Sequence, residues 1–193
     1  TKDDFGLLTI AINFIGFFLP SVGFGAHHGL IRFGAMQKGT NQDKLVSYSL
    51  ISGFKNQVIL SIVVIVSGIA LNFEKPVVCA FVLVMVFRLF GIFFLEMAKA
   101  ELRAKFQNDR FAKLEITSNF LALVLGVGFT LLWGVWGYVV SLCVFPYCVF
   151  LLHRFRFKKV HIPLLLKKIF WNFSVQSVVT LIIYMWVFLL DVF

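Results

Sequence analysis

Long stretches without a charged residue constrain this chain more than any other feature of its sequence. Residues 5–31 contain no Asp, Glu, Lys or Arg. A helix of that length, at about 1.5 Å per residue, exceeds the roughly 30 Å of hydrocarbon in a bilayer. Similar stretches with at most one charge each follow at residues 45–73, 76–95, 116–152 and 169–190. Because backbone in lipid must satisfy its own hydrogen bonds, the pattern predicts an all-α helix bundle that crosses a membrane several times.

The stretch at residues 116–152 is too long for one crossing and predicts two. It contains the sequence WGVWG at residues 133–137, and tryptophan at such a turn is typical of the aromatic belt at a membrane interface. We therefore expect a turn there, and about six transmembrane helices in all.

The first stretch also predicts a bend. Gly16, Pro20, Gly23 and Gly25 fall within ten residues, and proline or glycine kinks a membrane helix where neighbours or a cavity satisfy the freed backbone groups. Two interpretations stay open at this point: close helix packing through small residues, or a bend that lines a hydrophilic cavity.

Composition excludes two classes of protein. Hydrophobic residues make up 60% of the chain and its mean hydropathy is +0.94, so it has too little polar surface for a water-soluble domain. The net charge of +9 does not indicate nucleic acid, because the basic residues cluster in the connections between apolar stretches. The three cysteines lie inside apolar stretches without pairing or metal-binding spacing, and we interpret them as packing residues.

The basic residues are divided unequally between alternate connections. Thirteen Lys or Arg lie in one set, at residues 37–44, 98–113 and 153–168. Two lie in the other set, at residues 1–4, 72–76 and 133–137. By the positive-inside rule the first set is cytoplasmic. Within it, Glu101 and Lys105 stand four residues apart among strong helix formers, so residues 96–106 predict a solvated helical extension.

Three cations in or near the predicted spans are candidates for substrate binding: Arg32, Lys55 and Arg88. Arg88 lies roughly 18 Å along a helix that starts at Pro76, too deep for a flanking residue. Burial of Arg88 against lipid would cost about 2.5 to 3.5 kcal/mol. Few acids accompany these cations and a guanidinium fork suits phosphate, so we predict a cavity for an anionic lipid-linked or phosphorylated substrate.

Each of the three cations also has an alternative interpretation. Arg32 can be an ordinary anchor at the membrane end, Lys55 can extend its ammonium group to the interface, and Arg88 can pair with Glu96 or a carbonyl. The sequence contains no motif of a catalytic site, metal site or cofactor site. We therefore expect no catalytic residue, no metal and no cofactor, and we expect that the protein is not an enzyme.

At these residues the chain resembles a known family. The sequence Gly29–Gly34, followed by Lys44–Ser47, resembles the hairpin between the second and third helices of the Wzx-type polysaccharide (O-antigen) flippases, in the superfamily that also holds the MATE exporters. Further elements are similar to that family at Glu101–Ala104, Gly134–Tyr138, Thr1–Gly6 and Asp191. The resemblance covers nearly the whole chain.

The resemblance implies a division of the chain. The protein would be a fragment of a two-lobe MOP-type transporter, with one lobe plus the first helix of the second lobe. Residues 1–152 would form the first lobe with five spans, residues 153–168 the basic cytoplasmic linker, and residues 169–193 the truncated first helix of the second lobe. We expect that last helix to lie apart from the other five, because its own partners would be absent.

The resemblance also implies a function, in which an undecaprenyl-diphosphate-linked oligosaccharide crosses the cell inner membrane for surface polysaccharide biosynthesis. Its partners would be the lipid-linked oligosaccharide, membrane lipid and other polysaccharide assembly proteins, with no nucleic acid. Arg32 and Arg88 would contact the diphosphate. Two rival functions stay open. A cation-coupled MATE-like multidrug exporter should carry acids inside its spans, and a membrane-embedded glycan transferase or polymerase should carry a large extracytoplasmic loop.

Overall fold

A computed structural model describes residues 2–155, 157–158 and 160–190, and most of these residues lie in helices. Asp191, which the family resemblance includes, lies outside the described residues. The described residues contain no β-strand, and five apolar helical stretches among them are long enough to cross a membrane. This confirms the all-α, polytopic membrane fold.

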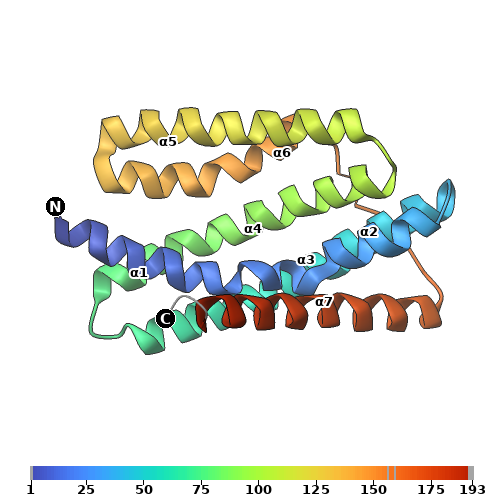
Figure 1. Ribbon diagram of the computed structural model, residues 1–193, viewed down its shortest axis with the longest axis horizontal. Helices are drawn as coiled ribbons and strands as arrows, with labels where there is room; N and C mark the ends of the chain where they lie inside the picture. Colours follow the sequence, from blue (N-terminus) through green and yellow to red (C-terminus); the bar gives the residue numbers. More distant parts are fainter. Residues whose placement is uncertain (1, 156, 159, 191–193) are drawn as a thin grey trace.

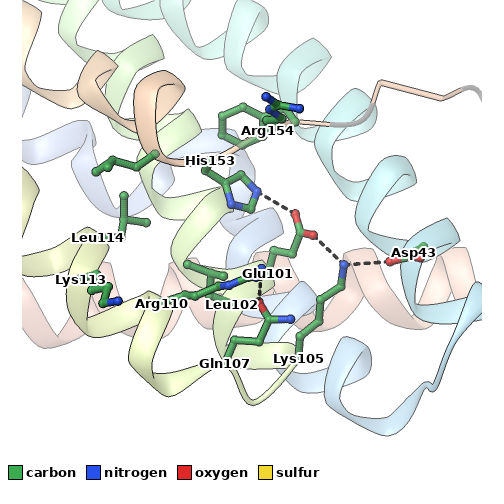
Figure 2. Close-up of a pocket in the computed structure, with 12 residues that line it drawn as sticks. Asp43, Glu101, Leu102, Lys105, Gln107, Arg110, Lys113, Leu114, His153 and Arg154 are labelled. Carbon is green, nitrogen blue, oxygen red and sulfur yellow. Dashed lines mark hydrogen bonds and ion pairs between the residues drawn. The ribbon is translucent and has the colours of Figure 1, made fainter.

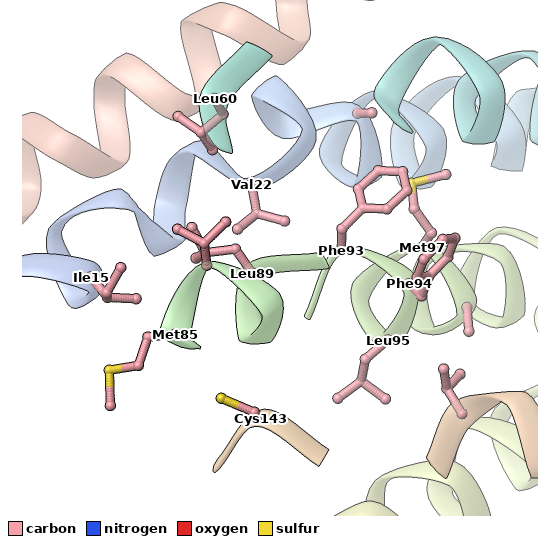
Figure 3. Close-up of a cluster of buried hydrophobic side chains, with 14 of the residues drawn as sticks. Ile15, Val22, Leu60, Met85, Leu89, Phe93, Phe94, Leu95, Met97 and Cys143 are labelled. Carbon is pink, nitrogen blue, oxygen red and sulfur yellow. The ribbon is translucent and has the colours of Figure 1, made fainter. Parts of the chain in front are cut away.

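One helix, α4, forms the centre of the bundle and packs against α1, α2, α3 and α5. The elements in chain order are α1 (Lys2–Phe18), η1 (Leu19–Gly25), α2 (Ala26–Met36), α3 (Thr40–Leu71), α4 (Pro76–Ala104), α5 (Asn108–Val144), η2 (Phe145–Cys148), α6 (Val149–Leu152) and α7 (Leu164–Leu190). Every fourth residue of α4 from Phe81 to Met97 is at most 2% exposed. Figure 3 shows four residues of this row, Met85, Leu89, Phe93 and Met97, among buried side chains of other elements.

The helix α5 turns back on itself, as the sequence predicts. Gly134 has φ 59° and ψ −134°, so the helix is interrupted there, and Figure 1 shows two antiparallel arms on either side of this turn. A Cβ atom on Gly126 would lie 4.0 Å from the Oγ of Ser141, across the two arms. The stretch Asn108–Leu152 therefore crosses the bundle twice, and the described residues make six crossings.

The predicted bend in the first span is also confirmed, at η1. Gly23, Phe24 and Gly25 all have positive φ, at 58°, 50° and 70°, so the hydrogen-bond ladder of α1 does not continue into α2. Gln57 of α3 is fully buried, and its Oε1 accepts a hydrogen bond of 2.9 Å from the backbone N–H of Gly23. One freed backbone group is thus satisfied inside the bundle by a side chain.

Small residues beside this bend admit a large ring. A Cβ atom on Gly23 would lie 2.8 Å from the ring of Phe93, and one on Gly53 would lie 2.9 Å from the same ring. Phe93 of α4 is 1% exposed. The bend is therefore a place of close packing through small residues, which is the first of the two interpretations given above.

The last helix, α7, does not lie apart from the others, so that expectation is wrong. It runs beside α2 and η1 (Figure 1), and Phe170 and Ser174 are fully buried. A Cβ atom on Gly29 would lie 2.8 Å from the ring of Phe170, and Trp171 donates a hydrogen bond of 3.0 Å from Nε1 to the hydroxyl of Tyr48. The glycine in α2 leaves room for an aromatic ring, and this provides α7 with a packing site within the bundle.

The two sets of connections lie at opposite ends of the molecule. In Figure 1 the connections from α2 to α3, from α4 to α5 and from α6 to α7 all run toward the right-hand end. The N-terminus, the turn from α3 to α4 and the turn at Gly134 lie toward the left-hand end. The connections that carry most of the basic residues therefore share one end of the bundle.

The end of α4 differs from the prediction in its burial. The helix continues to Ala104, as its helix-forming residues predict, but Ala98, Ala100 and Ala104 are at most 1% exposed. Gln42 donates hydrogen bonds from Nε2 to the carbonyl oxygens of Gly34 and Ala104, at 2.8 and 2.9 Å. One face of the extension is thus buried against α2 and the start of α3, and only the other face is solvated.

Candidate functional site

Arg88 lies on α4 where that helix meets the returning arm of α5 and η2. One turn earlier, the carbonyl oxygen of Val84 accepts a hydrogen bond of 3.4 Å from the thiol of Cys143. The carbonyl oxygen of Phe87 accepts one of 2.7 Å from the hydroxyl of Tyr147. The Nε of Arg88 is buried and has no hydrogen-bond partner among the described residues. A buried donor without a partner is costly, so this N–H group favours an added acceptor, such as an oxygen of an anion or of a water molecule.

Glu96, an alternative partner for Arg88 in the sequence, makes other ion pairs. Its carboxylate lies 3.3 Å from the ammonium group of Lys99, and Lys99 also lies 3.0 Å from the carboxylate of Glu115 on α5. These contacts join α4 to α5. No ion pair of Arg88 with an acid occurs within the described residues.

The other two predicted cations have different surroundings. Arg32 is exposed on α2, and its guanidinium carbon lies 4.4 Å from the ring centroid of Phe173 on α7, which is a cation–π contact. Lys55 is exposed on α3 and borders a small cavity together with Tyr48 and Lys167. Arg32, Lys55 and Arg88 therefore lie on three different helices, each with its own set of neighbours.

A cavity of about 1000 Å³ lies at the end of the bundle that carries the basic connections. It is bounded by the start of α3, the end of α4, the start of α5 and the chain that follows α6 (Figure 2). Its polar lining consists of Asp43, Glu101, Lys105, Gln107, Arg110, Lys113, His153 and Arg154. We refer to it below as the end pocket.

A chain of ion pairs crosses one side of the end pocket. Lys105 Nζ lies 2.8 Å from Asp43 Oδ1 and 2.7 Å from Glu101 Oε1, and His153 Nε2 lies 3.0 Å from Glu101 Oε2. Burial disfavours the charged form of Lys105, but the hydrogen bonds to Asp43 and Glu101 outweigh it and raise the pKa of Lys105. The sequence shows the local pair Glu101 and Lys105, whereas Asp43 and His153 join it only through tertiary structure.

Three further cations in the end pocket have no acidic partner among the described residues: Arg110, Lys113 and Arg154. Arg110 donates a hydrogen bond of 3.3 Å from Nη1 to the amide oxygen of Gln107, which is neutral. Sequence reasoning missed these residues individually, and their signal was the unequal division of basic residues between connections. Such an arrangement can bind an anion. Among the described residues no group of three His, Cys, Asp or Glu could hold a metal ion.

Comparison with known proteins identifies the family of this chain. A family model described as "Polysaccharide biosynthesis protein" matches residues 1–191, nearly the whole sequence. No curated protein and no solved structure shows significant similarity to it. The chain, with five apolar helical stretches long enough to cross a membrane among its described residues, belongs to the polysaccharide biosynthesis protein family.

Proposed function

We propose that this protein is a transporter that moves a lipid-linked oligosaccharide, carried on undecaprenyl diphosphate, across the inner membrane of the cell for surface polysaccharide biosynthesis. Family membership supports the pathway class, and the multi-pass fold supports a role in the membrane. The observation that carries the proposal is Arg88, whose buried Nε lacks a hydrogen-bond partner among the described residues.

The chemistry of Arg88 suits a diphosphate. A guanidinium inside a span is costly unless it meets water or an acceptor, and phosphate oxygens accept two parallel hydrogen bonds from it. Arg32 and Lys55 belong to the proposal as secondary contacts, because both are exposed and neither has an ion pair within the described part of the chain. In this proposal the protein binds and moves the substrate without making or breaking a covalent bond in it.

Substitution of Arg88 tests the proposal, in cells that depend on this protein for surface polysaccharide. Arg88→Ala and Arg88→Glu should abolish export at unchanged protein levels, whereas Arg88→Lys should retain part of it, because lysine keeps the charge and loses the fork. Arg103→Ala is the matched control. Arg103 lies in the last turn of the same helix, and its guanidinium stacks on the ring of Phe111. Normal export by Arg88→Ala would refute the proposal. Loss of drug resistance with intact glycan export would indicate the multidrug exporter instead.

The positive-inside rule predicts that the basic end is cytoplasmic, and this orientation has its own test. Single cysteines at Lys105 and Lys158, placed in a chain whose three native cysteines are replaced, should be protected from a membrane-impermeant thiol reagent added outside intact cells. A cysteine at Lys75, at the opposite end, should react. Labelling at Lys158 with protection at Lys75 would invert this orientation.

A further inference from the structure

We propose that the end pocket is a second anion site, which binds the phosphate group of a membrane-anchored lipid at the basic end of the bundle. The inference goes beyond the proposed transport at Arg88 and does not depend on it. It rests on the charges, the shape and the position of the end pocket.

The acids of the end pocket already make ion pairs with residues of the same cavity. Asp43 and Glu101 share the ammonium group of Lys105, at 2.8 and 2.7 Å. Glu101 also contacts the ring of His153, at 3.0 Å. Two carboxylates against one ammonium group leave one negative charge, which the three further cations of the cavity outnumber.

The remaining cations leave the end pocket with a surplus of positive charge. Arg110, Lys113 and Arg154 line it and make no ion pair in the described part of the chain. In Figure 2 Arg154 lies above the chain of ion pairs and Lys113 lies to its left, so the charges approach the cavity from different sides. Three cations that surround one cavity match an oxyanion with several acceptor oxygens.

The start of α5 adds donors to this surplus. The helix begins at Asn108 and has no side-chain cap. Of its first turn Arg110 lines the end pocket, whereas Asn108 and Asp109 line a neighbouring hollow. Asp109 in that first turn offsets part of the field, but Arg110 and Lys113 follow within the next turn and a half. A helix N-terminus together with unpaired cations is a favourable environment for phosphate.

The shape of the end pocket favours an amphiphile as the ligand. Its volume of about 1000 Å³ exceeds that of a single phosphate ion, and Leu102, Leu114 and Leu152 form part of its lining. The neighbouring Leu151 is 85% exposed on α6, at the end of an apolar span. A phosphate group with a hydrocarbon tail would place its charge among the cations and its tail along the span. Anionic phospholipids and lipid-linked diphosphates share this chemistry.

Binding to the purified full-length protein in nanodiscs of neutral lipid tests the proposal. The two probes are short-chain phosphatidylglycerol and farnesyl diphosphate, and the measurement is the dissociation constant of each. The triple variant Arg110→Gln, Lys113→Gln and Arg154→Gln should bind about 10- to 100-fold more weakly. The matched control Lys38→Gln, Lys44→Gln and Lys158→Gln removes the same charge from exposed residues outside the end pocket and should change binding less than about threefold.

The outcomes separate the two sources of phosphate. Loss of phosphatidylglycerol binding alone assigns the site to membrane lipid, loss of farnesyl diphosphate binding alone assigns it to the transported class of molecule, and loss of both supports a shared site. Equal losses of affinity in the two triple variants, or no loss in the first, would overturn the proposal.

A charge-conserving variant with Arg110→Lys and Arg154→Lys should keep most of the affinity. This control distinguishes loss of charge from misfolding as the cause of weaker binding in the triple variant. Binding should persist in Arg88→Ala, so failure of the transport proposal would leave this result unchanged.

Discussion

The helices α4 and α7 are both apolar enough to cross a membrane, yet they occupy the bundle in different ways. α4 is buried along most of its length against four neighbouring helices. On α7 the buried residues form one stripe, Phe170, Ser174 and Val178, spaced four residues apart. Other residues of α7, such as Ile183 and Tyr184, are more than half exposed. Apolarity thus accounts for the crossing of both helices and does not determine their place in the bundle.

The place of each helix depends on where small residues allow close approach. In lipid, apolar side chains gain little by leaving the hydrocarbon, so helices associate through packing and hydrogen bonds. Phe93 of α4 fits between two glycines, Gly23 and Gly53. Phe170 of α7 fits over one, Gly29. We infer that α4 contributes to global stability and that α7 is attached more locally.

Truncation of Phe93 should have the largest effect on stability. Phe93→Ala would leave a cavity between η1, α3 and α4. We expect it to lower the free energy of unfolding by about 3 kcal/mol. This value is at the low end for such truncations, because an apolar side chain gains little by leaving the hydrocarbon of the membrane. Denaturation of the purified protein in mixed micelles measures this. Phe87→Ala is the control, because Phe87 is 60% exposed. Equal losses of unfolding free energy in Phe93→Ala and Phe87→Ala would contradict the idea that the buried face of α4 dominates global stability.

Loss of the Gln57 amide should have an intermediate effect. Gln57→Leu leaves the N–H of Gly23 without its acceptor in a buried site, and we expect a loss of about 1 to 3 kcal/mol. Asn56→Leu changes the preceding residue, which makes no such bond in the described structure, and should cost less than about 0.5 kcal/mol. The same denaturation assay checks both. If Gln57→Leu proved neutral, the bend at η1 would not need this hydrogen bond.

Displacement of α7 should have the smallest effect on global stability and a clear local effect. Leucine at Gly29 would overlap Phe170 and Ser174, so Gly29→Leu should separate α7 from α2 while it lowers the free energy of unfolding by less than about 1 kcal/mol. Disulfide cross-linking between cysteines at Arg32 and Phe173 should fall several-fold. Gly16→Leu, at a position with open space around it, should leave cross-linking intact. A stability loss as large as that of Phe93→Ala would show that α7 is as integral as α4.

The sequence predicts the elements of this fold well, because their signals are local. Charge-free length predicts the crossings, glycine and proline predict the break at Leu19–Gly25, and glycine between tryptophans predicts the turn at Gly134. The packing position of α7 could not be predicted from the sequence, because it depends on the contact between Gly29 of α2 and Phe170 of α7. That relation joins residues more than a hundred positions apart.

The candidate sites were predictable only in part, for the same reason. Arg88 stands out because a charge inside an apolar stretch is visible in the sequence alone. Its particular environment beside Cys143 is not visible there, since the returning arm of α5 supplies it. The end pocket escaped prediction because Asp43, Lys105 and His153 converge from three separate connections. A count of basic residues identified the end of the bundle without identifying the cavity.

The break at η1 has a mechanical consequence. A continuous helix resists bending through its ladder of hydrogen bonds, whereas η1 has lost that ladder between α1 and α2. The angle between these two helices is held instead by the Gln57 hydrogen bond and by the ring of Phe93 between its glycines. A change of that angle would break one hydrogen bond and shift one ring, while the core contacts of α1 with α4 stayed in place. Two side chains from α3 and α4 therefore set the stiffness of the joint through which any movement of α2 and α7 reaches the rest of the bundle.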